Sequence, residues 1–292
     1  MALTAVDKLL AGYLGFVTLL IVSRGPFSDT ANGWMLLMHA LFGVMLYLFT
    51  RLRKTDRLGQ AIHVLYPVIM LLPFYSEIGL LNAQIAPETV YAHDAVIQSW
   101  ETLIFRGQVS FSWIRDHPSV FWSGVLHLAY FSYYPIVILG PVLLVLRRRR
   151  ADARAVVFAT MMAFVACYLF FVLYPVAGPN YAFAHPTGAV REVWSARLVY
   201  GVLAGGSSFG AAFPSSHVGA SVAATVALWR VWKPVGIAFT LPLALLTVGT
   251  VYCQMHYGID AIAGLVVGLM APFVAGRIAF PAPHPSPVAS GQ

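Results

Sequence analysis

Charged residues are scarce in this sequence of 292 residues: they make up only 10% of it, whereas hydrophobic residues make up 59%. A soluble domain needs a largely polar surface, so this composition excludes an ordinary soluble protein. Cysteine is rarer still, with only two residues in the chain. Cys167 and Cys253 lie in apolar surroundings without the spacing of a zinc site or of a disulfide framework. The sequence therefore predicts an integral membrane protein.

Long apolar stretches occupy most of the chain, and several approach the roughly 20 residues needed to cross about 30 Å of hydrocarbon. We expect eight helices, at residues 6–23, 33–50, 60–80, 119–146, 155–175, 214–232, 234–253 and 257–278. The predicted fold class is all-α, a polytopic membrane helix bundle formed by one membrane domain over residues 1–280. The proline-rich residues 281–292 are expected to be a disordered C-terminal tail.

The lysines and arginines predict the topology, because positively charged loops are retained in the cytoplasm. With both termini placed there, thirteen cations fall on the cytoplasmic side, namely Lys8, Arg51, Arg53, Lys54, Arg57, Arg147, Arg148, Arg149, Arg150, Arg154, Arg230, Lys233 and Arg277. Five fall on the outer side, namely Arg24, Arg106, Arg115, Arg191 and Arg197, and all but Arg24 lie in two long outer loops at residues 81–118 and 176–213. Basic residues that flank helices can contact anionic headgroups of membrane lipids, so the net charge of +7 requires no nucleic acid.

The segment FPSSHVGAS, residues 213–221, is typical of a loop that turns into a helix. Pro214 suits the first helical position, and Ser215 or Ser216 can cap the free N–H groups. Such a helix start attracts phosphate, and His217 would lie beside it in the first turn. The alternative interpretation is an ordinary capped helix with a histidine at the membrane interface.

A second segment, VYCQMHYGIDAIAG at residues 251–264, places His256 and Asp260 four residues apart on one helical face. Asp260 lies inside a predicted span without a neighbouring cation, and such a carboxylate predicts a functional role. A carboxylate held against one imidazole nitrogen leaves the other nitrogen basic, as a nucleophile or a general base requires. A packing or capping role for Asp260 is the alternative. The predicted topology opens both segments toward the outer side, so His217 and His256 can meet.

FPSSH followed some forty residues later by HYGID resembles the second and third motifs of the type 2 phosphatidic acid phosphatase superfamily. The resemblance spans roughly residues 120–280 and implies a six-helix core, with a catalytic region over about residues 119–280. It implies that His256 attacks phosphorus to form a phosphohistidine, that Asp260 orients it and that His217 protonates the leaving group. It also implies a phosphorylated lipid substrate, and no metal or other cofactor is required by these roles.

Some residues depart from the common phosphatase pattern. Gly249 and Thr250 stand where that pattern has Ser-Arg, so a phosphate-binding arginine is missing. The third motif instead resembles the branch of inositol phosphorylceramide synthases and their bacterial relatives, which implies a bacterial plasma membrane enzyme that uses a hydroxyl-bearing acceptor. The first motif is not in standard form; YPVAGPNYAF is its expected counterpart, with Asn180 where an arginine is expected.

A phosphoryl group that gains charge needs N–H, O–H or cationic donors. The predicted substrate-binding residues are Ser215, Ser216, Asn180, Tyr181, Arg191, Arg197 and Tyr257, with His185, Arg106 and Arg115 as further candidates. Each loop cation could equally be a solvated charge. The leading hypothesis is a lipid phosphatase or phosphotransferase acting at the outer membrane face, and hydrolysis and headgroup transfer both stay open. A bis-histidine haem protein and a transporter with Asp260 as an ion site are the alternatives from other classes.

Overall fold

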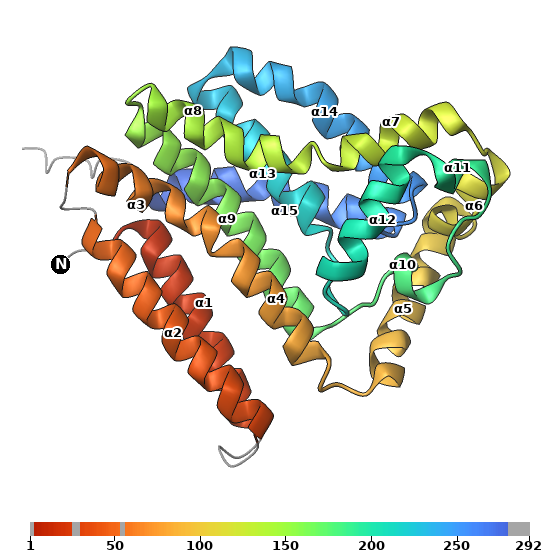
Figure 1. Ribbon diagram of the computed structural model, residues 1–292, viewed down its shortest axis with the longest axis horizontal. Coiled ribbons are helices and arrows are strands. Elements are labelled where there is room, and N and C mark those ends of the chain that lie inside the picture. The colour runs from red at the N-terminus through yellow and green to blue at the C-terminus, as the bar shows by residue number, and fades with distance from the viewer. Residues whose placement is uncertain (1–2, 25–29, 53–55, 280–292) are drawn as a thin grey trace, which may run out of the picture.

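The computed structural model describes residues 3–24, 30–52 and 56–279, and it is an all-α bundle (Figure 1). The described residues contain no strand beyond a single bridge between Val176 and Ala211. The elements are α1 (Ala5–Arg24), α2 (Thr30–Leu52), α3 (Arg57–Ile69), α4 (Leu71–Asn82), α5 (Pro87–Phe105), α6 (Val109–Asp116), α7 (Val120–Tyr130), the π-helical turn η1 (Pro135–Leu139), α8 (Gly140–Leu146), α9 (Arg150–Leu173), α10 (Pro179–Ala182), α11 (Ala189–Glu192), α12 (Trp194–Gly206), α13 (Ser216–Val231), α14 (Lys233–Tyr252) and α15 (Gly258–Ala279).

The predicted fold class is confirmed, and a helix or a run of helices stands at each predicted span. Seven of these in the described chain are long and apolar enough to cross a membrane: Ala5–Arg24, Ala31–Leu52, Arg57–Asn82, Val120–Leu146, Arg150–Leu173, Lys233–Tyr252 and Gly258–Ile278. The eighth prediction, residues 214–232, corresponds to α13, which has 16 residues and is largely buried among its neighbours. The tail predicted at residues 281–292 lies outside the described residues.

Proline interrupts two of the spans. The third span divides at Met70 into α3 and α4, and Pro73 cannot donate a hydrogen bond to the carbonyl of Ile69 four residues earlier. In the fourth span the α-helix ends at Tyr130, and the chain continues through η1. Pro135 in η1 has no N–H group to donate to the carbonyl four residues earlier.

Small residues bring α13 and α15 unusually close together. A β-carbon on Gly264 would lie 2.6 Å from the carbonyl oxygen of Ser215, and one on Gly268 would lie 2.5 Å from that of Gly219. Gly264 and Gly268 are four residues apart and therefore share a helix face, as in the small-residue contacts common between membrane helices. The two helices also pack against α9, so α9, α13 and α15 form the centre of the bundle.

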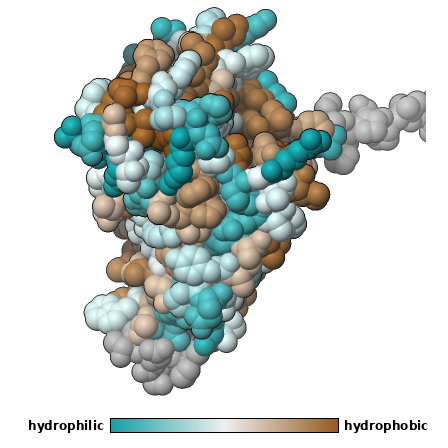
Figure 2. Space-filling view, turned by 90° about the vertical axis from the view of Figure 1, so that its right-hand side faces the viewer, coloured by the Kyte–Doolittle hydropathy of each residue, from teal (hydrophilic) through white to brown (hydrophobic). Residues whose placement is uncertain are grey.

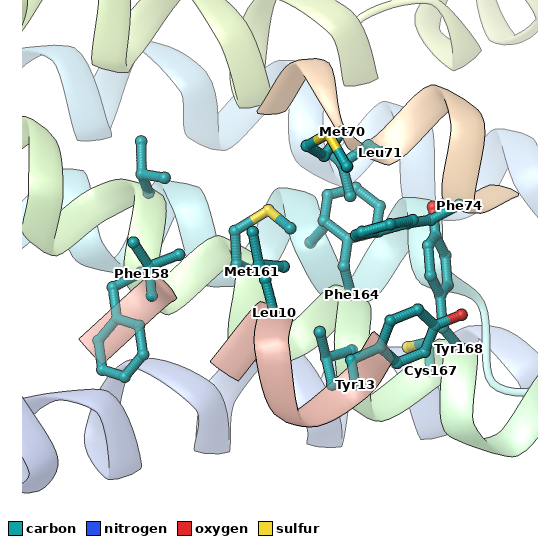
Figure 3. Packing of buried hydrophobic residues seen from close by; sticks show 14 of the residues in the cluster. Leu10, Tyr13, Met70, Leu71, Phe74, Phe158, Met161, Phe164, Cys167 and Tyr168 are labelled. Carbon is teal, nitrogen blue, oxygen red and sulfur yellow. The ribbon is translucent and has the colours of Figure 1, made fainter. Parts of the chain in front are cut away.

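Aromatic and aliphatic side chains join the N-terminal helices to this centre. Tyr13 of α1 lies 5.3 Å from the ring of Phe74 in α4 and 6.3 Å from that of Tyr168 in α9, measured between ring centroids. Figure 3 shows these rings with Leu10, Met161 and Phe164 around them. The N-terminal helices therefore pack against α9 rather than against the helices that carry the histidine motifs.

The two predicted outer loops are largely helical, which corrects their description as loops. Residues 81–118 contain α5 and α6, and residues 176–213 contain α10, α11 and α12. These elements lie together at one end of the bundle, on the right in Figure 1. Figure 2 views the molecule from that side and shows hydrophilic residues interspersed with apolar ones. The amphipathic helices thus cover the end at which α13 and α15 begin.

The contact between α13 and α15 can be tested with one added methyl group. We expect Gly268→Ala to lower the free energy of unfolding by about 1 to 3 kcal/mol, because the new β-carbon meets the carbonyl of Gly219 and the side chain of Val222. Gly276→Ala on the same helix is the matched control, because no atom lies within 4 Å of its added β-carbon. Thermal unfolding in detergent measures both; equal melting temperatures would contradict the close contact.

Candidate active site

The first turn of α13 carries His217. Ser215 is the N-cap, and its Oγ accepts a hydrogen bond of 3.4 Å from the N–H of Val218. The N–H of Ser215 donates to the backbone carbonyl of Asp260 at 3.0 Å. This bond joins the two sequence motifs directly, so the start of α13 is fixed to the first turn of α15.

His256 lies in the short turn between α14 and α15. Gln254 in this turn has a φ of 60°, and the N–H of His256 donates to the carbonyl of Thr250 at 2.9 Å. The Nδ1 atom of His256 is 3.4 Å from Oδ2 of Asp260, and the same oxygen accepts a bond of 2.9 Å from the N–H of Tyr257. The predicted pair of His256 and Asp260 is therefore present, although the contact between them is long. Nε2 is the ring nitrogen of His256 that does not face Asp260.

The two histidines face each other across a small cavity. Their ring centroids are 5.9 Å apart, and the hydroxyl of Tyr130 lies 3.2 Å from Nε2 of His217. The cavity has a volume of about 40 Å³. Its lining residues are Tyr75, Tyr130, Ala177, Asn180, Tyr181, Leu203, Ser207, Ser208, Ala211, Ala212, His217, Met255 and His256.

A larger, mostly apolar cavity adjoins this one and shares Tyr75, Tyr130, Leu203 and His217 with it. Its volume is about 360 Å³. It extends between α3–α4, the α7–η1 region and α12, along side chains such as Leu72, Val137 and Val202. A ligand with a polar head and an apolar chain would fit this pair of cavities, with its head at the histidines.

Helix α5 braces the site, and sequence reasoning missed it. Both carboxylate oxygens of Asp94 accept backbone bonds, of 2.8 Å from Gly178 and 2.7 Å from Ala177. Asp94 also accepts a bond of 2.9 Å from the hydroxyl of Tyr257, and Gln98 donates to that hydroxyl at 2.9 Å. The signal was available in the sequence, because these polar residues are four apart and therefore lie on one face of a helix.

The same face of α5 carries Glu101, which is fully buried. Its two oxygens accept bonds of 2.8 Å from the N–H groups of Ser110 and Gly258. Gly258 is the first residue of α15, so a carboxylate also lies at the positive end of that helix. A β-carbon on Gly258 would come within 2.7 Å of the Phe105 ring, so the start of α15 packs closely against the end of α5.

Burial is the largest influence on the titration of these groups. It raises the pKa of Asp94 and of Glu101, although the N–H groups that they accept lower it in part. Burial, followed by the charge of Asp94, raises the pKa of Tyr257, so that phenol remains a hydrogen-bond donor. Burial also lowers the pKa of His256 to about 4, against an opposing effect of a hydrogen bond with the Ala212 backbone. His256 is therefore neutral at neutral pH.

Only some of the other predicted binding residues line the histidine cavity. Asn180 and Tyr181 line the histidine cavity, and Tyr181 shares a hydrogen bond of 2.5 Å with Ser207. Ser216 lines the apolar cavity, whereas Tyr257 is buried behind His256 against Asp94. Tyr75, Tyr130 and Ser208 line the site without having been predicted, because they come from distant segments with no motif of their own.

The predicted loop arginines lie away from the histidine cavity. Arg191 stacks on the Tyr200 ring and bonds to His185 at 3.2 Å. Arg197 pairs with Glu192, and both side chains are about two-thirds exposed. Among the described residues, no lysine or arginine lines the histidine cavity, and no cluster of three or more His, Cys, Asp or Glu side chains could hold a metal ion.

Arg115 connects segments around the site through hydrogen bonds. Its guanidinium donates to Oε1 of Gln254 at 2.7 Å and to the carbonyl of Ala184 at 2.5 Å. Gln254 in turn donates to the carbonyls of Pro179 and Ala184, both at 3.1 Å. These bonds connect α6, the turn that carries His256 and the segment that follows α10.

One known protein family matches this chain. No curated protein and no solved structure matches the chain. A family model described as the PAP2 superfamily matches residues 96–274, which is more than half of the chain. The match begins within α5 and includes both histidine motifs, whereas α1 to α4 lie before it. The chain therefore belongs to the PAP2 superfamily.

Proposed function

We propose that this protein is a membrane enzyme that cleaves a phosphate ester of a lipid and transfers the phosphoryl group, to water or to an alcohol, through a phosphohistidine on His256. Membership of the PAP2 superfamily supports an enzyme of the phosphatase type that acts on phosphorylated lipids. One observation supports the roles assigned to the residues. His217 and His256 face the same cavity with their ring centroids 5.9 Å apart, and Asp260 lies beside His256.

The proposed first step is attack of Nε2 of His256 on phosphorus. Asp260 accepts a hydrogen bond from the Nδ1–H of His256, which fixes the tautomer in which Nε2 carries the free electron pair. The contact of 3.4 Å is long, as catalytic hydrogen bonds often are before a substrate binds. Asp260 is oriented independently by the N–H of Tyr257, so it has little freedom to turn away.

His217 is the proposed general acid. As the bond from phosphorus to the leaving oxygen breaks, protonated His217 gives its proton to that oxygen, and the departing alcohol is neutral. An anionic phosphate nearby favours the protonated imidazole. In the second step, water or an alcohol attacks the phosphohistidine, gives its proton to His217 and restores His256.

The phosphate would be held mainly by neutral donors. The N–H groups of Ser216 and His217 belong to the first turn of α13 and precede its ladder of hydrogen bonds. They point toward an anion at the helix start, where the helix dipole is also favourable. Asn180 and Tyr181 can add donors from α10, which lines the same cavity.

The apolar cavity is the proposed site for the chain of the lipid, because it joins the histidine cavity at Tyr75 and Tyr130. The excess of lysines and arginines at one end supports cytoplasmic termini and a site that faces outward. The lipid would then enter from the outer leaflet.

Headgroup transfer between lipids is the second candidate, and one specific observation favours it. No lysine or arginine among the described residues lines the histidine cavity. A phosphate monoester carries about two negative charges at neutral pH, whereas a phosphodiester carries one and needs less cationic compensation. A phosphodiester lipid as donor and a hydroxyl-bearing acceptor would therefore suit this cavity, which is the reaction of the inositol phosphorylceramide synthase type.

The role of His256 is tested with His256→Gln, which removes the nucleophile at similar volume. We expect turnover to fall by at least about a thousandfold, since the covalent step is lost. The measurement is phosphate release from phosphatidic and prenyl diphosphate lipids, together with headgroup transfer from a phosphodiester lipid to a hydroxyl-bearing lipid. The matched control is His117→Gln, because His117 is exposed and belongs to neither motif. Turnover that survives in the His256 variant would contradict the proposal.

The dependence of turnover on pH follows from the lowered pKa of His256. Protonation destroys its nucleophilicity, so kcat/KM should fall with decreasing pH only near pH 4, instead of near the ordinary histidine value of about 6.5. A phosphodiester substrate makes the measurement clean, because its phosphate does not titrate in this range. An acidic limb at about pH 6.5 would show that His256 is not the buried neutral base described here.

The brace by α5 is tested with Asp94→Asn. The amide cannot accept from both backbone N–H groups and the Tyr257 hydroxyl, so the turn that carries His256 should lose its position. We expect kcat to fall about tenfold to a hundredfold with little change in KM. Ser99→Ala, on the exposed side of α5, should leave kcat unchanged. An equal loss of folded protein and activity would mean that Asp94 only stabilises the fold.

A further inference from the structure

A separate cavity lies at the end of α15 opposite to the histidines. Its volume is about 690 Å³, and it is formed by the first turns of α1, the first three turns of α9 and the last turn of α15. The lining residues are Thr4, Ala5, Val6, Lys8, Leu9, Ala151, Arg154, Ala155, Phe158, Met162 and Ile278. Neither histidine motif contributes to it.

Two cations line this cavity without a partner. Neither Lys8 nor Arg154 has a hydrogen bond or ion pair from its side chain to any described residue, and both are exposed. The neighbouring arginines differ: Arg149 pairs with Asp152 at 2.7 Å, and Arg150 donates to Gln60 at 2.8 Å. The two cations of the cavity are thus free to bind an anion.

The nearby carboxylates do not neutralise them. Asp7 is buried and accepts bonds from the hydroxyl of Tyr66 at 2.5 Å and from the N–H of Thr4 at 2.8 Å. Its other contact is with His63, at 3.5 Å. Asp152 is occupied by Arg149. The cavity therefore keeps a positive charge.

The walls below the cations are apolar and follow the helices into the bundle. Phe158 and Met162 lie four and eight residues after Arg154 in α9, which corresponds to about 6 Å and 12 Å along the helix axis. Leu9 of α1 and Ile278 of α15 face the same space. A positive rim above an apolar groove complements a molecule with an anionic head and hydrocarbon chains.

We propose that this cavity binds an anionic phospholipid, with its phosphate between Lys8 and Arg154 and an acyl chain along Phe158 and Met162. A free phosphate would use only the rim and would leave the apolar wall in water. The lipid also suits the location, because the cations of the chain gather at this end, where anionic headgroups are attracted to basic residues next to membrane helices.

Native mass spectrometry of the full chain tests the proposal by counting retained lipids. The probes are phosphatidylglycerol and phosphatidylcholine with identical chains, and glycerol phosphate as the headgroup alone. We expect wild type to retain one phosphatidylglycerol in preference to phosphatidylcholine, and Lys8→Gln with Arg154→Gln to weaken that binding at least tenfold. Arg51→Gln with Lys233→Gln is the control, because it removes the same charge at the same end outside the cavity.

Ala155→Phe separates the contribution of the groove from that of charge. This substitution fills the apolar wall and should also displace the lipid, while melting temperatures confirm that each variant is folded. Equal binding of both lipids by wild type, or equal losses in the two charge variants, would overturn the proposal. So would displacement of the lipid by glycerol phosphate alone.

Discussion

The close approach of α13 and α15 is the constraint on which the rest of the structure depends. Glycines at positions 219, 264 and 268 let one helix backbone lie against the other, and the N–H of Ser215 bonds directly to the carbonyl of Asp260. Because each histidine stands within or beside the first turn of one of these helices, their separation is set by backbone contact. Longer side chains in this contact would part the helices and the two rings with them.

The end of the bundle at which these helices begin is held by buried carboxylates. Asp94 binds the turn at Ala177 and Gly178, Glu101 binds the first residue of α15, and Asp260 binds the N–H of Tyr257. Each accepts from backbone N–H groups, and this compensates part of the cost of burying a charge. The result is a rigid support beneath His256, and α10 with Tyr181 forms another part of the wall of the histidine cavity.

The N-terminal helices precede the part of the chain that matches the family, and they contain polar contacts of their own. His39 of α2 contacts Glu77 of α4, and Thr18 of α1 lies 2.8 Å from the other ring nitrogen of His39. Asp7 and His63 form a second pair between α1 and α3. Polar groups inside a membrane span are costly alone, so paired contacts of this kind fix which helices are neighbours.

The sequence determined the class of fold, because long apolar stretches permit little besides membrane helices, and the order of those helices placed both histidine motifs at one end. It also indicated the pairing of His256 with Asp260, although His256 lies in the turn before α15 and not on the helix itself. The interruptions at Pro73 and Pro135 were readable in principle from the chemistry of proline.

Only the tertiary structure decided what surrounds the histidines. Tyr75, Tyr130 and Asp94 come from three separate elements, and no local pattern says that their side chains converge. The loop arginines were expected near the phosphate, yet Arg191 and Arg197 found closer partners in Tyr200 and Glu192. Local spacing fixes which residues share a helix face, whereas the direction in which each helix packs is settled by contacts between residues far apart in the chain.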